Sequence, residues 1–299
     1  MIDELAHAGP EHLDPAFVAG YDRKQGFPDP AEDLDAFAAH GLDGGSAVVD
    51  LGAGAGQFAL AAARRFGHVM AVDVSPAMLA VLRERAAAAG LANLDCVRAG
   101  FLSYQHHGHN ADGVYTRNAL HQLPDFFKAL ALDRIARMLR PGGVLRLRDL
   151  IYDFRPADTG EIFRGWFDGA AADPADGYTA ADYAEHIRTE FSTFRWLLEP
   201  MLAAAGFEIV TVDFERRLYG AYTCVKANQD SRSYGPPQSP RKSGTGSTGL
   251  SGAAGQVQLR VRSGRSWPGL RWRRPPARRP GRCLGATRPV PPSMGAGRG

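Results

Sequence analysis

The sequence predicts an α/β fold in which a mostly parallel sheet carries helices on both faces. Between about residues 45 and 228, short apolar runs of strand length alternate with helical patterns of ten to fifteen residues. Strands that alternate with such helices are joined by right-handed crossovers and lie parallel in one sheet. A glycine-rich turn, Gly52-Ala53-Gly54-Ala55-Gly56, joins the first strand to the next helix, which is typical of a cofactor-binding edge.

Residues 1–44 are expected to form a helical cap. Asp29 supplies an N-cap, Pro30 stands at the first helical position, and Gly41 closes the helix. The stretch Tyr21–Phe27 is polar and aromatic together, which predicts a surface loop, with the edge of a lid over a cofactor as the alternative.

The regular part of the chain gives the core of the sheet. Expected strands cover residues 48–51, 69–72, 94–97, 112–116 and 144–149. Expected helices cover residues 57–66, run from Pro76 to before Gly90 with Ser75 as N-cap, and run from Asp125 to a stop at Arg140-Pro141-Gly142-Gly143. Residues 45–228 are therefore the expected catalytic domain.

Residues 152–195 are too long and too aromatic for a plain connection, so we expect an insertion that covers a substrate site. A helix over residues 196–205 and two closing strands at 207–214 and 221–225 should complete the domain.

The last part of the chain, residues 229–299, has a different composition. It holds 14 Lys and Arg against one acid, Asp230; of the 35 basic and 32 acidic residues, 21 and 31 remain before it, so the body carries −10 and the tail +13. Gly, Pro, Ser and Arg dominate, which predicts a disordered tail. Such a tail could bind RNA or acidic surfaces, with Trp267 and Trp272 as stacking groups. Because no Arg-Gly-Gly or Arg-Ser repeat appears, we favour the interpretation that the tail has no function.

The remaining composition points to a cytoplasmic protein. Cys96, Cys224 and Cys283 are widely separated, which argues against a disulfide framework and a zinc knuckle. No apolar stretch approaches a membrane span and no basic signal-peptide start is present, so no membrane partner is expected. The cluster His106-His107-x-His109 predicts a solvated loop, and no metal is expected.

Acidic residues at the ends of the first two strands indicate the kind of cofactor. Asp50 stands at the glycine turn, where a carboxylate repels phosphate and suits a cationic ligand. Asp73 ends the second strand, the usual position for gripping a ribose diol. A dinucleotide fingerprint would need a glycine where Gln57 stands.

The motif Asp50-x-Gly-x-Gly-x-Gly with Val72-Asp73, followed by Thr116–Asp125 and Leu139–Gly143, resembles class I S-adenosylmethionine-dependent methyltransferases, in particular the small-molecule type of ubiquinone and menaquinone biosynthesis. The resemblance implies a Rossmann-like, seven-stranded sheet, S-adenosylmethionine as cofactor and a final hairpin with one antiparallel strand. The cofactor-binding residues that it implies are Asp50, Gly52, Ala53, Gly54, Gly56, Asp73, Val74, Met78, Gly100, Phe101, Arg117 and Asn118. Because Ala99-Gly100-Phe101 stands where the family often has an acid, we expect adenine to be held by backbone groups and by Phe101 or Met78.

His121 is the candidate general base. It follows the fourth strand at the carboxyl edge of the sheet, and its reference pKa of about 6.5 suits proton transfer. The alternative, that it only packs and hydrogen-bonds at the entry of a helix, stays open. The expected walls of the substrate pocket are Tyr21, His121, Asp149, Tyr152, Trp166, Tyr183 and His186.

The predicted function is methyl transfer to an O, N or C atom of a small-molecule acceptor by in-line displacement, for which the enzyme supplies alignment and water exclusion. One alternative is a regulatory protein that binds the cofactor without catalysis. An RNA methyltransferase is less favoured, because the acidic body would repel a phosphate backbone.

Overall fold

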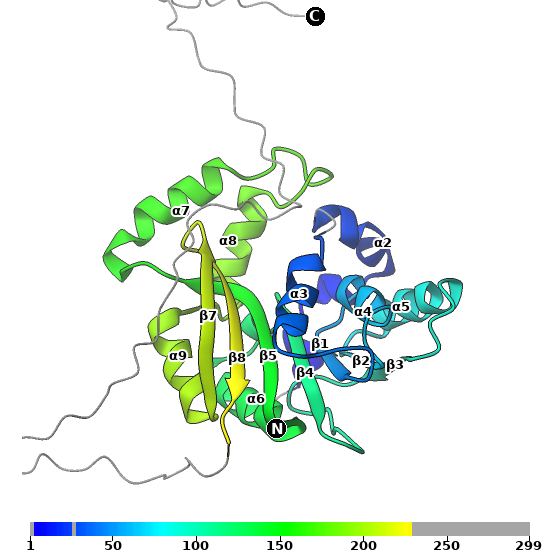
Figure 1. Cartoon of the computed structure of the whole chain (residues 1–299). Helices are drawn as coiled ribbons and strands as arrows, with labels where there is room; N and C mark the ends of the chain where they lie inside the picture. Colours follow the sequence, from blue (N-terminus) through cyan, green and yellow to red (C-terminus); the bar gives the residue numbers. More distant parts are fainter. Residues whose placement is uncertain (1–2, 26–27, 229–299) are drawn as a thin grey trace, which may run out of the picture.

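The computed structural model describes residues 3–25 and 28–228 (Figure 1). The tail predicted at residues 229–299 lies outside the described residues. The strands are β1 (Ala47–Leu51), β2 (His68–Asp73), β3 (Leu94–Arg98), β4 (Ala111–Arg117), β5 (Leu139–Tyr152), β6 (Thr193–Phe194), β7 (Phe207–Glu215) and β8 (Tyr219–Lys226).

All eight strands belong to one sheet. Its order is β3-β2-β1-β4-β5-β8-β7, and β6 pairs with β5 off this path. Strands β1 to β5 pair in parallel, whereas β8 runs antiparallel to both β5 and β7, as the closing hairpin predicted. The sequence predicts seven strands, whereas the described residues form eight, and β6 is the strand that was not expected. That strand has two residues, which pair with Ile151 and Tyr152, and so short a segment has no periodicity to detect.

Helices cover both faces of the sheet. They are α1 (Glu4–His7), α2 (Pro15–Lys24), α3 (Ala31–Ala39), α4 (Gln57–Ala62), α5 (Pro76–Ala88), α6 (Asp125–Met138), α7 (Thr159–Asp168), α8 (Ala180–Thr189) and α9 (Arg195–Ala204). Short 3₁₀ helices lie at Pro10–Leu13, Leu120–Gln122 and Pro156–Asp158. One apolar core joins the sheet to α6 and α9, and a second joins it to α3, α4 and α5 (Figure 1).

The helix that follows β2 begins as its sequence predicts. The Ser75 side chain accepts a hydrogen bond from the Met78 N–H at 3.1 Å, and Pro76 stands in the first turn. After α6 the boundary differs from the prediction. The helix does end at Met138, but Arg140-Pro141-Gly142-Gly143 already belongs to β5, where Gly142 has φ +74° and the ladder to β4 changes register.

Two segments far apart in the sequence meet over the carboxyl ends of the parallel strands (Figure 1). Helices α7 and α8 pack in an aromatic cluster with the end of β5. From the other side, Lys24 at the end of α2 forms an ion pair with Asp182 at 3.2 Å, and Gln25 donates a hydrogen bond to the Tyr178 hydroxyl at 2.6 Å. The carboxyl edge of the sheet is thus covered by α2 and by the insertion together. Among the described residues, no helix combines the length and apolar character needed to span a membrane.

Candidate functional site

Three cavities meet at the carboxyl ends of β1, β2 and β4. A cavity of about 60 Å³ lies at the glycine turn, one of about 90 Å³ lies beside Asp73, and one of about 740 Å³ lies under α7 and α8. Tyr21, Arg117 and Asn118 line all three cavities. A ligand at the glycine turn and a ligand under the insertion would therefore meet at these three side chains.

The first cavity is built on the glycine turn. Gly52, Gly54 and Gly56 all have positive φ, at +77°, +53° and +88°, which lets the chain turn sharply between β1 and α4. Gly52 and Gly54 line this cavity together with Asp50 and Ala53. Gly56 does not line the three cavities, because it packs against Leu82 of α5.

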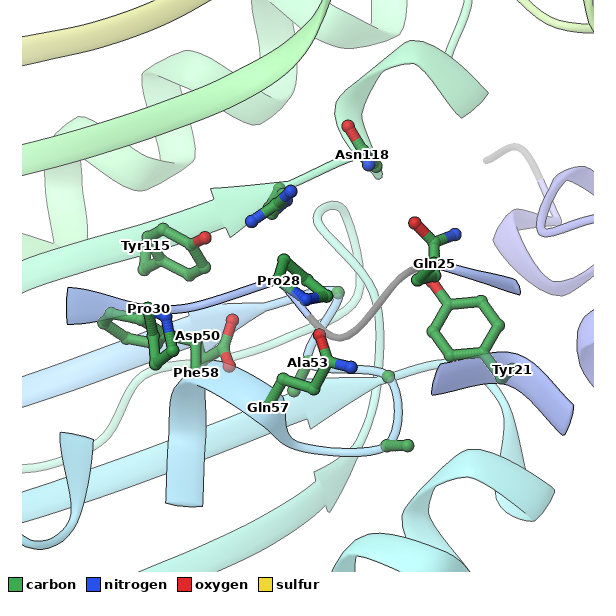
Figure 2. A pocket seen from close by; sticks show the side chains of 14 residues that line it. Tyr21, Gln25, Pro28, Pro30, Asp50, Ala53, Gln57, Phe58, Tyr115 and Asn118 are labelled. Atoms are coloured by element: carbon green, nitrogen blue, oxygen red, sulfur yellow. The ribbon is translucent and has the colours of Figure 1, made fainter. Parts of the chain in front are cut away.

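Asp50 is the main charged group of the first cavity. Figure 2 shows its carboxylate at the end of β1, beneath Tyr115 and facing the space bounded by Pro28 and Gln57. It is 2 % exposed, and among the described residues its Oδ2 atom has no hydrogen-bond partner. Burial and the nearby charge of Asp73 raise its pKa well above the usual range. A ligand that brings a positive charge or an N–H donor would satisfy this carboxylate.

The second cavity extends the site along the end of β2. The N–H groups of Gly54 and Ser75 donate to the two carboxylate oxygens of Asp73, each at 2.8 Å, and so hold the side chain at the edge. Burial raises the Asp73 pKa, although these backbone donors oppose the shift. The predicted residues on this cavity are Gly52, Gly54, Asp73, Val74, Met78, Gly100, Phe101, Arg117 and Asn118.

The two small cavities are covered by the N-terminal segment. Glu4 of α1 accepts hydrogen bonds from the Leu102 N–H at 2.9 Å and from the Ser103 hydroxyl at 2.8 Å. Farther along, the Ser75 hydroxyl donates to the His12 carbonyl at 2.6 Å. These contacts place α1 and the following turn directly over the loop that carries Gly100 and Phe101. The sequence motifs do not indicate this contact.

Asn118 occupies the junction of the cavities in a strained conformation. Its φ is +49°, in the left-handed region that non-glycine residues rarely adopt, and its N–H donates to the Arg148 carbonyl at 2.9 Å. Among the described side chains, its Oδ1 is one of the buried oxygens without a hydrogen-bond partner. Strain together with an unsatisfied oxygen is typical of a ligand-binding position.

The large cavity contains four of the predicted substrate residues besides Tyr21, namely His121, Trp166, Tyr183 and His186. Trp166 and Tyr183 stack with ring centroids 4.2 Å apart, which gives one wall an aromatic surface. Asp149 and Tyr152 do not line the three cavities. Asp149 lies behind His121, and the Tyr152 ring packs against Phe154, Phe163 and Phe194.

Several residues of this cavity were missed by the sequence analysis. They include Lys24, Tyr178, Asp182, Glu190 and Tyr219. His186 and Glu190 stand four residues apart at the end of α8, and this spacing places two side chains on one helix face. It was the one sequence signal that could have drawn attention to Glu190.

His121 lies between two carboxylates at the wall of the large cavity. Its Nδ1 contacts Asp149 Oδ1, its backbone N–H donates to Asp149 Oδ2 at 3.0 Å, and its Nε2 lies 3.0 Å from Glu190 Oε2. Burial lowers its pKa, but the charges of Asp149 and Glu190 outweigh burial and raise the pKa to about 10. In this arrangement the ring is protonated at neutral pH, and a protonated ring does not accept a further proton.

Comparison with known protein families identifies the part of the chain that carries this site. Residues 48–143 match the profile of the methyltransferase domain family. This part of the chain is therefore a methyltransferase domain. No curated protein is similar enough in sequence to count as a relative. S-adenosylmethionine, the cofactor that the sequence predicts, fits this site, because Asp50 offers a buried, unsatisfied carboxylate to a cationic ligand, and Gly52 and Gly54 line the cavity without adding side chains to it.

Solved structures share the fold of this methyltransferase domain at low sequence identity. An S-adenosylmethionine-dependent methyltransferase from Aquifex aeolicus superposes with a TM-score of 0.50 at 20% identity, over 72% of this chain and 99% of that one. Magnesium protoporphyrin IX methyltransferase from Synechocystis gives 0.53 at 13% identity, over 76% and 99%. The cyclase SpnF gives 0.50 at 19% identity, over 67% and 80%. These likenesses show the fold alone, and the acceptor has to be argued from the site.

Proposed function

We propose that this methyltransferase moves the methyl group of S-adenosylmethionine to a small-molecule acceptor bound in the cavity of about 740 Å³. The observation that carries the proposal is the junction at Tyr21, Arg117 and Asn118, which line this cavity and both cavities of the glycine turn. The volume falls within the range of roughly 300–1,000 Å³ that is usual for small-molecule sites.

The position of each residue in the cavities indicates the role that we propose for it. Bound S-adenosylmethionine supplies a methyl group that is already activated by a positively charged sulfur. Asp50 would bind its ammonium group, Asp73 would bind its ribose, and Asn118 would form the floor between cofactor and acceptor. Helices α7 and α8 would exclude water, which aids a displacement between uncharged or oppositely charged groups.

The walls of the large cavity favour a flat acceptor. The stacked pair Trp166 and Tyr183 presents aromatic surface, and Lys24, Tyr178 and His186 add polar groups around it. An aromatic ring with a few polar substituents would fit such walls, and quinone precursors, which the sequence resemblance suggests, are one class of this kind. We therefore place phenols and quinone precursors first, and amines second.

A screen for methyl acceptors tests the proposal. Purified protein and radiolabelled S-adenosylmethionine would be incubated with panels of phenols, quinone precursors, amines and thiols, and separately with structured RNA. Labelling of a small molecule is expected. Labelling of RNA without any small-molecule product would replace this proposal, and cofactor binding without any transfer across all panels would favour a regulatory role.

Trp166→Ala should locate the acceptor in the large cavity. It removes one side of the stacked wall, so we expect a rise of about tenfold or more in the acceptor KM, with the affinity for S-adenosylhomocysteine nearly unchanged. Trp196→Ala is the matched control, because Trp196 is 54 % exposed on α9 and does not line the cavity. Equal effects of both variants would show that the acceptor binds elsewhere.

Asp73→Ala tests the proposed ribose contact. Loss of hydrogen bonds to a charged group corresponds to about 1.5–3 kcal/mol, so calorimetry should show roughly 10- to 100-fold weaker binding of S-adenosylhomocysteine. Asp95→Ala on the neighbouring strand β3 is the control, since Asp95 is exposed and does not line the cofactor cavities. Unchanged affinity in Asp73→Ala would remove Asp73 from the cofactor site.

A further inference from the structure

Three side chains that the sequence keeps apart point their ligand atoms at one place on the wall of the large cavity. His121 Nε2, His186 Nδ1 and Glu190 Oε2 all lie within 4.8 Å of one another. His121 stands in the turn after β4, and the other two stand at the end of α8. All three line the large cavity, and their side chains are only 6 %, 11 % and 18 % exposed.

Both imidazole rings are held in the orientation that a metal ligand requires. The Nδ1 atom of His121 contacts Asp149, and the Nε2 atom of His186 lies 2.7 Å from the Ser192 hydroxyl. In each ring one nitrogen is therefore held by a fixed partner, Asp149 or Ser192, and the other nitrogen faces Glu190. Metal-binding histidines show this pattern, in which a carboxylate or hydroxyl behind the ring fixes the tautomer and the direction of the ligand nitrogen.

A buried carboxylate oxygen lies between the two rings. Glu190 Oε2 is 3.0 Å from His121 Nε2 and also contacts His186 Nδ1, so two ring nitrogens and one oxygen converge on one point. Asp149 contacts the other nitrogen of His121, so the His121 ring lies between two carboxylates. A divalent cation at the point that the three ligand atoms share would displace the Nε2 proton of His121 to solvent, compensate both carboxylates and bind the oxygen.

We propose that His121, His186 and Glu190 bind a divalent transition-metal ion of the Zn²⁺ type, with its open coordination position toward the large cavity. Two imidazoles and one carboxylate form a ligand set used by catalytic zinc sites, in which a fourth position is left to water or substrate. No metal was expected from the sequence, in which the one metal-like spacing is the cluster around His106, whereas this ligand set is assembled by the fold.

Coordination asks for little rearrangement. The amide nitrogen of Gln122 lies 3.2 Å from His121 Nε2 and would turn aside into the cavity that Gln122 also lines. If the proposed methyl transfer holds, the ion would bind an oxygen or sulfur of the acceptor at its open position, and the proton displaced on coordination would pass to solvent. Metal binding itself is independent of that reaction.

Metal titration of the full chain tests the site. The protein would be stripped with a chelator, dialysed and titrated calorimetrically with Zn²⁺, and metal content would be measured after desalting, with neither methyl donor nor acceptor present. One equivalent of tightly bound Zn²⁺ is expected, and Co²⁺ in its place should give the visible absorption bands of a four- or five-coordinate site. Failure to retain an equivalent would overturn the metal proposal and leave the methyl-transfer proposal standing.

Matched variants locate the ion. Glu190→Gln and His186→Ala should each weaken Zn²⁺ binding at least tenfold and change the Co²⁺ spectrum. Glu185→Gln and His7→Gln should not, because Glu185 and His7 line the same cavity outside the cluster. Thermal melts without metal would establish that each variant folds. Equal retention of Zn²⁺ in all four folded variants would place the ion elsewhere and refute the assignment.

Discussion

Arg148 of β5 donates from Nη1 to both carboxylate oxygens of Asp33 on α3, at 3.0 and 2.9 Å. Asp33 is fully buried, and it also accepts hydrogen bonds from Arg146 at 2.7 Å and from the Tyr115 hydroxyl at 2.9 Å. This network fixes α3 to the sheet next to the first cofactor cavity, which Tyr115 lines. Helix α3 is thereby tied to the strands that carry the site.

Asp33→Asn should destabilise the fold strongly, because it leaves two buried arginines with the exposed Glu32 in place of a buried carboxylate partner. A loss of about 3–5 kcal/mol in the free energy of unfolding is expected from urea denaturation. Asp35→Asn on the same helix is the control. Asp35 is exposed and pairs with the exposed Arg65, so its loss should cost about 1 kcal/mol or less.

The same carboxylate predicts a pH dependence. Burial raises the Asp33 pKa, but the charges of Arg146 and Arg148 outweigh it and hold the pKa below its usual range. A lowered pKa contributes stability that is complete above the unfolded value of about 3.9 and disappears as the pH falls through the folded value. The melting temperature of the parent protein should therefore fall more steeply below about pH 5 than that of Asp33→Asn. Parallel curves would contradict this role.

The parts of the fold that the sequence predicts best are those set by local chemistry. Ser75 and Pro76 mark the start of α5, and the glycines after Asp50 mark the turn, because caps and positive φ depend on residues close in sequence. The parallel strands followed from apolar runs between helices. The start of β5 was misplaced, because Pro141 and two glycines normally stop a strand and here occupy an irregular end of it.

What the sequence did not predict are contacts between distant segments. The Arg148–Asp33 pair joins residues 115 positions apart, and Glu190 reaches His121 from the insertion. No periodicity or motif records such distances, since they depend on how crossovers place the elements in space. Asp50 and Asp73 were found because each stands at the end of a predicted strand beside the glycine turn, and the family resemblance supports the same two residues. The helices that cover the cofactor edge became visible only with the fold.

Two glycines of the turn should respond differently to alanine. A Cβ at Gly56 would lie 2.0 Å from the Leu82 Cδ1 atom, whereas a Cβ at Gly54 would meet Tyr21 at 3.6 Å, an ordinary contact. Both have positive φ, so both variants carry a similar backbone cost of about 1 kcal/mol. Gly56→Ala should lose a further 1–3 kcal/mol or so by overpacking. Gly54→Ala should instead weaken S-adenosylhomocysteine binding, on the order of tenfold.

Chemical denaturation and calorimetry on both variants separate these effects. The common backbone cost cancels in the comparison, so the difference in stability reports the contact with Leu82. If Gly56→Ala proved as stable as Gly54→Ala, α5 would have to shift easily. If Gly54→Ala bound the cofactor normally, the glycine turn would not face it.

Truncation after Asn228 should leave the fold intact. Among the described residues the last strand ends at Lys226, and the Ala227 N–H donates to the Gly206 carbonyl at 2.9 Å, so the described hydrogen bonding of the sheet closes before residue 229. We expect the melting temperature to change by less than a few degrees and cofactor affinity to stay the same. A larger fall would show that residues 229–299 contribute to the fold.

Glu4 should control access to the cofactor edge. It closes α1 over the loop of Gly100 and Phe101, where the cavity has about 90 Å³, well below the roughly 300–1,000 Å³ of usual ligand sites. A cofactor that reaches this loop has to displace α1. The closed form then reduces the apparent affinity by the fraction of molecules that are open.

Glu4→Ala removes both hydrogen bonds and favours the open form. S-adenosylhomocysteine should bind up to about tenfold more tightly, and its association rate in stopped-flow measurements should rise in proportion. Glu84→Ala, at an exposed position of α5, is the control and should change neither quantity. Weaker binding in Glu4→Ala would mean the opposite, namely that Glu4 contacts the cofactor and that α1 is a wall of its site. An unchanged affinity would show that α1 already opens freely.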